Sequence, residues 1–394
     1  MEKVHIIAAR RTPIGKFLGS FAEVSAVDLG AIVVKQILKD TGLPPEEVGQ
    51  LIFGQARQAG NGPNPARQVL IRSNLPEDCT AYTVNMACAS GLKAIQLGAQ
   101  TIQSGQYSVV IVGGMENMTQ VPFFLPEFRR GYRLGHAPVI DGMYRDGFHC
   151  PLADQLMGRT AETLAEQYHI SRESQDQFAL YSQQKCVRAQ KEGRFQKELV
   201  PVELPSKKGP PTLLVQDEHP RADTDLTSLK KLAPVFKEEG SVHAGNSSGI
   251  TDGAAALVLV SESYLKAHQL TSLAVIESFS EVGVDPKIMG IGPVPAVQKL
   301  LQKTKKQINE FSCIELNEAF AAQVLACQRE LKFSEEVLNI NGGSIALGHP
   351  IGATGSRIVV TLVHEMNRSQ RISGLATLCI SGGMGMALSL LKEE

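Results

Sequence analysis

The chain has 394 residues, of which 43% are hydrophobic and 20% charged, and its formal net charge is −1. This length and composition can bury a large core and predict two or three domains. The near-zero charge gives no reason to expect nucleic acid or an acidic membrane as a partner, and no apolar run approaches the roughly 20 residues of a membrane-spanning helix.

The first 120 residues alternate short β-rich runs with helical patterns. In chain order we expect a strand at 4–9, a helix at 28–40, a strand at 48–54, a helix at 65–73, a strand at 80–85, a helix after Cys88 and a strand at 108–113. Such alternation predicts an α/β domain with a mostly parallel central sheet.

The pattern breaks into loops and polar helices between about residues 121 and 243. Helices are expected at 160–168 and 172–192, the second beginning after Ser171, and a turn or surface loop at 205–211. A loop-rich insertion on a rigid scaffold is typical of substrate contacts. A merely solvated excursion is the competing interpretation.

The last 120 residues repeat the α/β theme. Helices are expected at 294–302, at 317–331 and from about Ala353, followed by a hairpin-like pair of strands at 374–380 and 385–391. Segments 109–115 and 377–384 are both apolar strands that end in Gly-Gly-Met. This faint echo indicates an internal repeat, although strands followed by Gly-Gly are common in α/β proteins.

The seven cysteines are an odd number, and no two lie closer than nine residues in the sequence. This spacing suggests neither a zinc site nor a disulfide framework, so we expect reduced thiols in a cytosol. Cys186, Cys313 and Cys327 are predicted to be small buried hydrophobes, whereas Cys79 and Cys150 stay unassigned. The N-terminal apolar stretch is too short for a secretory signal, and the protein is expected to be cytoplasmic.

Three small-residue turns, 85–91, 348–355 and 378–385, contain Cys88, His349 and Cys379. Apolar residues at helical spacing follow Cys88 and place it at a helix start, where a thiol feels the positive end of the helix dipole. An ordinary thiol is only about 3% thiolate at pH 7, so a nucleophilic Cys88 also needs a base. His349 is the candidate for that base.

Together with Asn317 to Ala322, these turns resemble the thiolase family, which contains acetyl-CoA acetyltransferases and 3-ketoacyl-CoA thiolases. The resemblance covers essentially the whole chain and includes, in family order, residues 113–118, 244–249, 252–255 and 289–296. It implies a thiolase fold, with two similar α/β halves in a layered α-β-α-β-α arrangement and an inserted loop domain.

The resemblance also implies domain boundaries. Residues 1–120 with 245–270 would form the half that carries Cys88, residues 121–244 the loop domain with coenzyme A contacts, and residues 271–394 the half that carries His349 and Cys379. Family members are commonly tetramers made of two dimers, so a homotetramer is expected.

The chemistry that the resemblance implies is acyl transfer through a covalent intermediate. Cys88 would carry the acyl group while Cys379 moves the proton, which divides a difficult step into easier ones. Family precedent assigns the enolate oxygen to His349 and to a water positioned by Asn317. It assigns the oxygen of the acyl-cysteine to backbone N–H groups of Cys88 and Ser381.

Two positions depart from the family pattern. Ser381 stands where a glycine is usual, and a positive φ there would be costly for serine, so reduced or altered activity is expected at most. Leu156 stands where short-chain enzymes commonly have histidine, which makes the acyl region more apolar and keeps longer acyl chains possible.

The remaining family positions concern coenzyme A, which is expected as substrate and not as a permanently bound cofactor; no metal site is expected. Arg221 matches a position near the adenine. The other matching positions are pantetheine and thioester contacts, namely Met157, Ala244, Ser248, Met289, Ala319 and Phe320.

The leading interpretation is an acetyl-CoA C-acetyltransferase that condenses two acetyl-CoA molecules reversibly to acetoacetyl-CoA and coenzyme A. A 3-ketoacyl-CoA thiolase of broader chain length, acting in fatty-acid degradation, is the nearest alternative. A decarboxylating ketoacyl synthase is disfavoured by Cys379. A non-catalytic acyl-CoA carrier is disfavoured because it would not need both cysteines.

Overall fold

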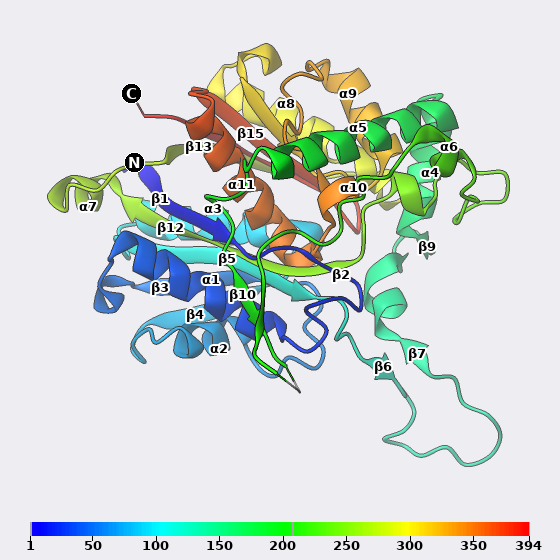
Figure 1. Ribbon diagram of the computed structural model, residues 1–394, viewed down its shortest axis with the longest axis horizontal. Coiled ribbons are helices and arrows are strands. Elements are labelled where there is room, and N and C mark those ends of the chain that lie inside the picture. The colour runs from blue at the N-terminus through cyan, green and yellow to red at the C-terminus, as the bar shows by residue number, and fades with distance from the viewer. Residues whose placement is uncertain (1, 207–208, 394) are drawn as a thin grey trace.

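The computed structural model describes residues 2–206 and 209–393 and shows a mixed α/β architecture around a ten-stranded sheet (Figure 1). The strand order is β14-β15-β16-β13-β1-β12-β5-β3-β4, and β2 pairs with β12. The strands of this sheet are β1 (Val4–Arg11), β2 (Gly15–Lys16), β3 (Gln50–Gly54), β4 (Thr80–Val84), β5 (Val109–Asn117), β12 (Thr251–Ser261), β13 (Ala274–Gly283), β14 (Cys313–Leu316), β15 (Ser373–Ile380) and β16 (Met384–Leu391).

Eleven α-helices lie along the described chain, besides short 3₁₀ and π-helical turns. They are α1 (Ala26–Thr41), α2 (Pro65–Arg72), α3 (Ser90–Gln103), α4 (Met157–Gln167), α5 (Arg172–Lys191), α6 (Leu226–Lys230), α7 (Glu262–Ala267), α8 (Pro293–Thr304), α9 (Ala321–Leu331), α10 (Ser344–Leu347) and α11 (Ile351–Arg368). Three small hairpins complete the list: β6 (Phe123–Phe124) with β7 (Ile140–Asp141), β8 (His149–Cys150) with β9 (Gln155–Leu156), and β10 (Val202–Leu204) with β11 (Thr212–Leu214).

The prediction of a mostly parallel sheet was wrong. Only β3–β4, β3–β5 and β14–β15 are parallel, and the other pairings of the main sheet are antiparallel. The reason is local: β16 returns from β15 through a short turn, which forces an antiparallel pair. On the other side, β12 re-enters after the loop-rich segment and runs antiparallel to both β1 and β5.

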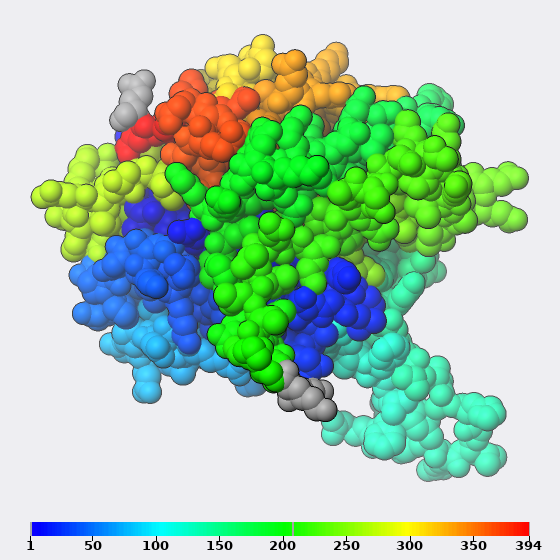
Figure 2. Space-filling view, viewed as in Figure 1, coloured from blue at the N-terminus to red at the C-terminus, as the bar shows by residue number. Residues whose placement is uncertain are grey.

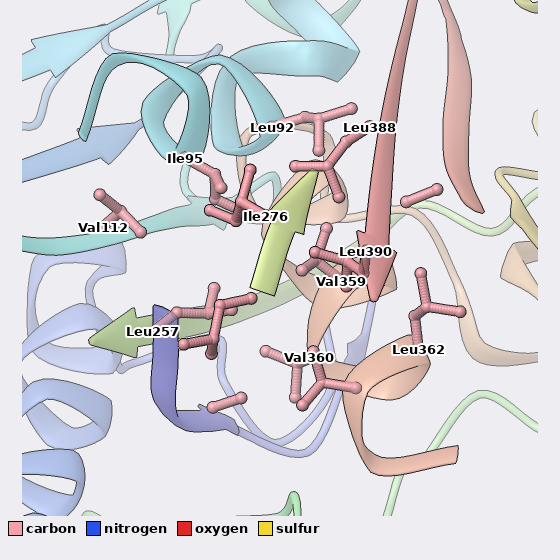
Figure 3. Packing of buried hydrophobic residues seen from close by; sticks show 14 of the residues in the cluster. Leu92, Ile95, Val112, Leu257, Ile276, Val359, Val360, Leu362, Leu388 and Leu390 are labelled. Carbon is pink, nitrogen blue, oxygen red and sulfur yellow. The ribbon is translucent and has the colours of Figure 1, made fainter. Parts of the chain in front are cut away.

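The predicted layering of two similar halves is confirmed. The helices α3 and α11 lie between the two halves of the sheet and share one apolar core with both (Figure 3). Alternate residues of each strand face the other way, as the period of two requires. On the face of the sheet turned away from α3 and α11, α1 and α2 cover β5 and β12, while α8 and α9 cover β14 and β15.

The internal echo corresponds to real structural equivalence between the halves. Both β5 and β15 follow a central helix, and each has one parallel and one antiparallel neighbour. Their Gly-Gly pairs differ, however. Gly114 lies inside β5, where an added Cβ would sit 2.2 Å from the carbonyl oxygen of Gly352. Glycine therefore lets the start of α11 approach β5 closely.

Most other predicted elements are present, with shifted ends. The helix expected at 172–192 is α5, and the hydroxyl of Ser171 caps it by accepting the N–H of Ser174 at 3.2 Å. The helix expected at 317–331 begins only at Ala321, because Phe320 and the residues before it are not helical. The loop expected at 205–211 contains residues 207–208, which lie outside the described residues.

Part of the loop-rich segment projects from the body of the molecule. The chain between β6 and β7 forms a long arm, visible in teal in Figure 2. Its apolar side chains include Phe128 and Leu134, which are 68% and 99% exposed. Among the described residues, none of the helices is long and apolar enough to span a bilayer.

Candidate active site

Cys88 lies in a 3₁₀ turn, Ala87–Ala89, immediately before α3. Two side chains fix this turn: the Asn85 carbonyl oxygen accepts the N–H of Ala87 at 3.0 Å, and the Ser90 hydroxyl accepts the N–H of Met86 at 2.9 Å. Ala87 takes a positive φ of 46°. The half-buried thiol is thus held at the N-terminal end of α3, as the apolar spacing predicts.

The helix start does not by itself make Cys88 a thiolate. Burial raises the pKa of its thiol, outweighing the lowering effects of the backbone N–H groups of Ser381 and Cys88 and of the positive charge on Arg57. The resting group is therefore a neutral thiol. Nucleophilic attack from this sulfur requires a base that removes its proton.

His349 is placed to supply such a base. It is only 7% exposed, and burial together with the charges of Arg357 and Arg57 lowers its pKa to about 3, so the ring is neutral at physiological pH. Its Nδ1 lies 2.6 Å from the hydroxyl oxygen of Thr354, whose own hydrogen goes to the carbonyl of Pro350 at 3.0 Å. Nδ1 therefore carries the ring proton.

The other ring nitrogen of His349 is left with its lone pair. Nε2 is buried and has no hydrogen-bond partner among the described residues. A neutral imidazole with a free, unprotonated nitrogen can accept a proton from a nearby thiol.

Cys379 lies near the end of β15 and is fully buried. Burial and the neighbouring Cys88 raise the pKa of its thiol well above the ordinary value. The end of β15 and the start of α11 both pack against the 3₁₀ turn of Cys88. The structure thus brings the three predicted groups, Cys88, His349 and Cys379, to one region between the two halves.

Ser381, two residues after Cys379, does not have the strained backbone that the sequence suggested. Ser381 is not among the described residues with positive φ; the turn instead uses Gly382 and Gly383, with φ of 89° and 86°. The backbone N–H of Ser381 is directed at the Cys88 sulfur. The side chain at 381 therefore leaves the donor intact.

Asn317 follows β14 and is anchored beside β15 by a 3.0 Å hydrogen bond from its backbone N–H to the carbonyl of Thr377. Its side chain is 1% exposed. The amide oxygen accepts the hydroxyl of Ser344 at 2.6 Å, while Nδ2 has no partner among the described residues. Buried donors are rarely left unpaired, so Nδ2 is suited to hold a water or a substrate oxygen.

Glu116 joins the two halves next to Cys88. Its buried carboxylate accepts backbone N–H groups of Ala56 and Arg57 from the loop after β3, and of Gly352 from α11 at 2.8 Å. Burial raises the pKa of this carboxyl, and the three N–H groups and Arg57 oppose that shift. The contacts fix the start of α11 relative to β3 and β5.

A cavity of about 490 Å³ lies beside this region. Its lining contains five of the seven predicted coenzyme A contacts: Met157, Arg221, Ala244, Ser248 and Phe320. Met289 and Ala319 do not line it; they pack with Phe320 in the apolar cluster that contains Cys379. The wall is largely apolar and aromatic, with contributions from Tyr144, Phe148, Leu156, Val235, Phe236 and Ile250.

The cavity reaches toward Cys88. Phe148 and Ile250 line it, and both also belong to an apolar cluster that includes Cys88. Gly249, another lining residue, accepts the backbone N–H of His349 at 3.0 Å. A thioester seated here would have its arm along the loop-rich segment and its reactive end near the two cysteines.

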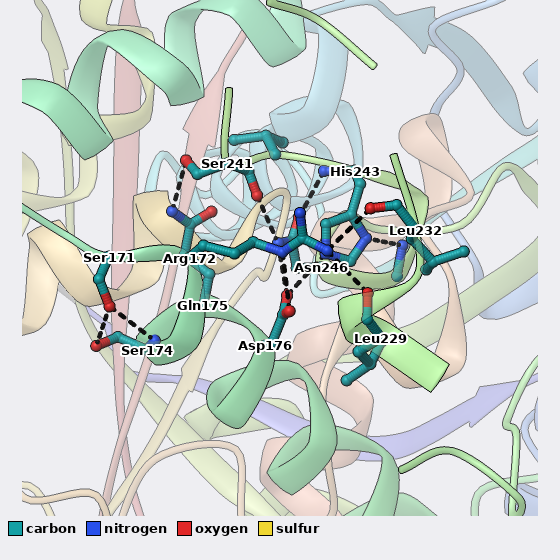
Figure 4. Close-up of polar contacts among 12 residues, drawn as sticks. Ser171, Arg172, Ser174, Gln175, Asp176, Leu229, Leu232, Ser241, His243 and Asn246 are labelled. Atoms are coloured by element: carbon teal, nitrogen blue, oxygen red, sulfur yellow. Dashed lines mark hydrogen bonds and ion pairs between the residues drawn. The ribbon is translucent and has the colours of Figure 1, made fainter. Parts of the chain in front are cut away.

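A polar network holds one wall of the cavity in place (Figure 4). Asp176 of α5 accepts hydrogen bonds from Arg172 at 2.8 Å and Asn246 at 3.1 Å, and lies 2.7 Å from the ring of His243. Arg172 also donates to the carbonyl oxygen of Leu232 at 3.0 Å. These bonds attach the segment of Ala244 and Ser248 to α5.

Sequence reasoning missed several residues of this region. Thr354, Ser344 and Glu116 act on His349, Asn317 and the start of α11, respectively. Only Thr354 had a local signal, since it lies five residues after His349 in the same small-residue turn. The other two contacts join segments that are distant in sequence.

The two-half sheet with two cysteines and a histidine at its centre defines the thiolase class of acyltransferases. The chain matches the thiolase N-terminal domain over residues 4–263 and the thiolase C-terminal domain over residues 270–392. It is 49% identical over 394 residues, the full length of both chains, to a probable acetyl-CoA acyltransferase of Staphylococcus aureus (strain COL). The chain therefore belongs to the thiolase family and is an acyltransferase.

Solved structures agree with the fold. A crystal structure of the Bacillus anthracis acetyl-CoA acetyltransferase has a TM-score of 0.97 and 42% identity, covering 99% of each chain. A crystal structure of human mitochondrial 3-ketoacyl-CoA thiolase has a TM-score of 0.96 and 38% identity, covering 100% of this chain and 99% of that one. The chain is thus similar to enzymes of both substrate types.

Proposed function

We propose that the protein is an acetyl-CoA C-acetyltransferase that condenses two acetyl-CoA molecules reversibly to acetoacetyl-CoA and coenzyme A. The observation that carries this proposal is the neutral His349, with an unprotonated Nε2, in the same region as the half-buried Cys88 thiol and the fully buried Cys379 thiol. A carrier would need neither a base nor a second thiol.

In the first step, Nε2 of His349 takes the proton of the Cys88 thiol, and the sulfur attacks the thioester carbon of acetyl-CoA. The bond to coenzyme A breaks, its thiolate recovers the proton from His349, and acetyl-Cys88 remains. Backbone N–H groups of Cys88 and Ser381 stabilise the oxyanion of this step.

In the second step, His349, neutral again, takes the proton of the Cys379 thiol, and the resulting thiolate removes a proton from the methyl carbon of another acetyl-CoA. The carbanion attacks the carbonyl carbon of acetyl-Cys88, acetoacetyl-CoA forms, and the Cys88 sulfur leaves with the electron pair and recovers a proton from His349. In the reverse direction, the neutral Cys379 thiol protonates the departing enolate. Its raised pKa fits that acid role. His349, protonated on Nε2 at this step, and a water held by Asn317 donate hydrogen bonds to the enolate oxygen.

Coenzyme A is proposed to lie in the 490 Å³ cavity, with its adenine end near Arg221 and its pantetheine arm near Ser248 and Ala244. The Arg221 side chain is exposed and forms no hydrogen bond or ion pair within the described residues, so it is free to meet a ligand. Met157 and Phe320 contribute cavity wall, while Met289 and Ala319 support it from behind, beside Cys379.

The direct test is thiolysis of acetoacetyl-CoA by the purified full chain in the presence of coenzyme A, followed by loss of the enolate absorbance. Mass spectrometry after exposure to acetyl-CoA should find one acetyl group on the peptide that contains Cys88. Absence of turnover with intact coenzyme A binding would contradict an enzymatic role. Acetylation at another cysteine would contradict the assignment of Cys88.

A broader chain-length range in fatty-acid degradation is the second candidate, and it is favoured by the apolar cavity wall at Leu156, Phe148 and Tyr144. Comparing C4 with longer 3-ketoacyl-CoA substrates separates the two. In the same assay, Leu156→His should lower kcat/KM for long chains more than for C4. Val235→Thr, a similar polar change in the same wall, serves as the matched control.

We further propose a cytoplasmic homotetramer in which residues 1–120 with 245–270, 121–244, and 271–394 act as nucleophile half, loop domain and base-bearing half. Two features support assembly: β4 ends the sheet beside the Cys88 turn, and the arm between β6 and β7 exposes large apolar side chains. A reducing compartment suits two working thiols. Analytical ultracentrifugation tests the tetramer, and a monomer at micromolar concentration would contradict it.

A further inference from the structure

Asn317 presents its amide in one orientation only. The side chain is 1% exposed, and its oxygen accepts the hydroxyl of Ser344 at 2.6 Å. Its Nδ2 is buried without a partner among the described residues. The acceptor end is therefore used inside the protein, and both N–H donors remain available to a ligand.

A third residue, Arg357, determines which group donates and which accepts in the hydrogen bond between Ser344 and Asn317. Ser344 is fully buried, and Nη2 of Arg357 donates to its hydroxyl oxygen at 3.0 Å. A guanidinium can only donate, so the hydroxyl hydrogen is free to point at Asn317. A flipped Asn317 amide would direct N–H groups at an oxygen that already accepts from Arg357. It would also leave the hydroxyl hydrogen without an acceptor.

Arg357 and Ser344 are themselves held in place by further contacts. Arg357 is 2% exposed and faces the carboxylate of Glu315 at 3.5 Å. Ser344 opens α10, and the N–H of the next residue donates to Glu318 at 3.1 Å. An added Cβ on Gly343 would lie 2.2 Å from the carboxyl carbon of Glu318, so the chain can approach this carboxylate only as glycine.

We propose that Ser344 is a positioning residue that acts through Asn317. By accepting from Arg357 and donating to Asn317, it fixes the amide so that its donor end faces the active site. The inference rests on the proposed function, because this polarity matters for turnover only if Asn317 serves the oxygen of the second acetyl-CoA.

The polarity favours one chemical step. When Cys379 removes the methyl proton of acetyl-CoA, the electron pair moves onto the thioester oxygen, which then needs hydrogen-bond donors directly or through a water. An amide oxygen in the same place would repel the developing charge. The acetylation of Cys88 uses other donors, so it does not depend on Ser344.

The test is a double-mutant cycle on the full chain with Ser344→Ala and Asn317→Ala. Ser344→Ala should lower kcat for condensation by about tenfold, the worth of one hydrogen bond, with a KM for acetyl-CoA changed by less than about twofold. Its rate of Cys88 acetylation should stay at the wild-type value. In the Asn317→Ala background, Ser344→Ala should cause no further loss of kcat.

Asn317→Asp examines the amide polarity directly. The carboxylate keeps an acceptor for Ser344 but replaces the two N–H donors with a second oxygen. We expect a loss of kcat at least as large as in Asn317→Ala. Wild-type kcat in Asn317→Asp would overturn the inference, as would a Ser344→Ala effect that is the same with and without Asn317.

Ser389→Ala is the matched control. Ser389 is also fully buried, in β16, and its hydroxyl has no partner among the described residues, so its removal should leave kcat unchanged. An equal loss in Ser389→Ala would show a general effect of buried serines and would overturn the proposal. An inactive wild type would refute the proposed function and with it this inference, whereas an active wild type with additive variants refutes this inference alone.

Discussion

The two cysteines at the centre of the molecule sit in different surroundings. Cys88 is half-buried on a turn, with two backbone N–H groups and the charge of Arg57 directed at its sulfur. Cys379 is fully buried in a strand, where burial and Cys88 itself raise its pKa and only its own backbone opposes them. This difference in burial supports the proposed roles, in which the more open Cys88 carries the acyl group and the fully buried Cys379 moves the proton.

Removing the open thiol should have the largest effect. Cys88→Ala should abolish thiolysis of acetoacetyl-CoA, a loss of roughly 10⁴-fold or more, because no acyl intermediate can form. Binding of coenzyme A, measured by calorimetry, should persist, since the 490 Å³ cavity is lined by other residues. Turnover of Cys88→Ala within tenfold of wild type would show that Cys88 does not carry the acyl group.

Removing the fully buried thiol should slow condensation strongly but leave the acetylation of Cys88 nearly unchanged. Cys379→Ala should lower the condensation rate by about 10²- to 10⁴-fold, the usual worth of a positioned acid or base. Acetylation of Cys88, followed by mass spectrometry, should stay within about threefold of wild type. Cys327→Ala, at another fully buried cysteine, is the control. Unchanged condensation in Cys379→Ala would show that the proton travels elsewhere.

The donors that distinguish Cys88 can be tested by backbone substitution. Ser381→Pro removes the N–H directed at the Cys88 sulfur and should lower kcat by about 10²- to 10³-fold. Ser381→Gly keeps the N–H and should stay close to wild type. Thermal unfolding of both variants checks the fold, and equal activity of the two would exclude this donor from the reaction.

The burial of His349 should have a smaller effect, which appears in the pH dependence of the free energy of unfolding. The pKa of His349 is about 3 in the folded chain and near 6.5 when unfolded, so between these values only the unfolded chain binds the proton. Stability therefore falls as pH drops below about 6.5, by about 2 kcal/mol at pH 5 from this residue.

Urea unfolding at pH 7 and pH 5 measures this fall. His349→Gln should lose less stability than wild type over that interval, because it has no proton to gain. His268→Gln, at an exposed histidine, should keep the wild-type difference. Parallel curves for wild type and His349→Gln would mean that the imidazole is not held neutral by burial.

The sequence alone was enough to predict those candidate groups that stand in local motifs. Cys88, His349 and Cys379 stand in short turns rich in glycine and alanine, and helical spacing after Cys88 located the start of α3 correctly. The layered fold was implied by the family resemblance that these motifs support, and not by the alternation of strands and helices. Residues whose role depends on long-range contacts could not be predicted in this way, because Ser344 contacts Asn317 across 27 residues of sequence.

The relative directions of the strands could not be predicted for a related reason. Alternating strands and helices do not reveal that β12 pairs antiparallel with β5 after a long insertion. The helical pattern after Asn317 likewise hid an extended stretch, since Phe320 has φ of −148° and α9 starts after it. A backbone bridge to Ser247 holds Phe320 in this extended conformation, which the local helical pattern does not reveal.

Glu116 links the two halves of the enzyme and so limits the mutations that either half can accept. Its carboxylate belongs to the first half, yet one of its partners is the N–H of Gly352 in the second. Losing a partner of a buried carboxylate costs about 1–3 kcal/mol, so sliding one half against the other is penalised near the proposed catalytic residues. A mutation that shifts either half is thus expected to cost stability unless it preserves this contact, so each half constrains the changes that the other can accept.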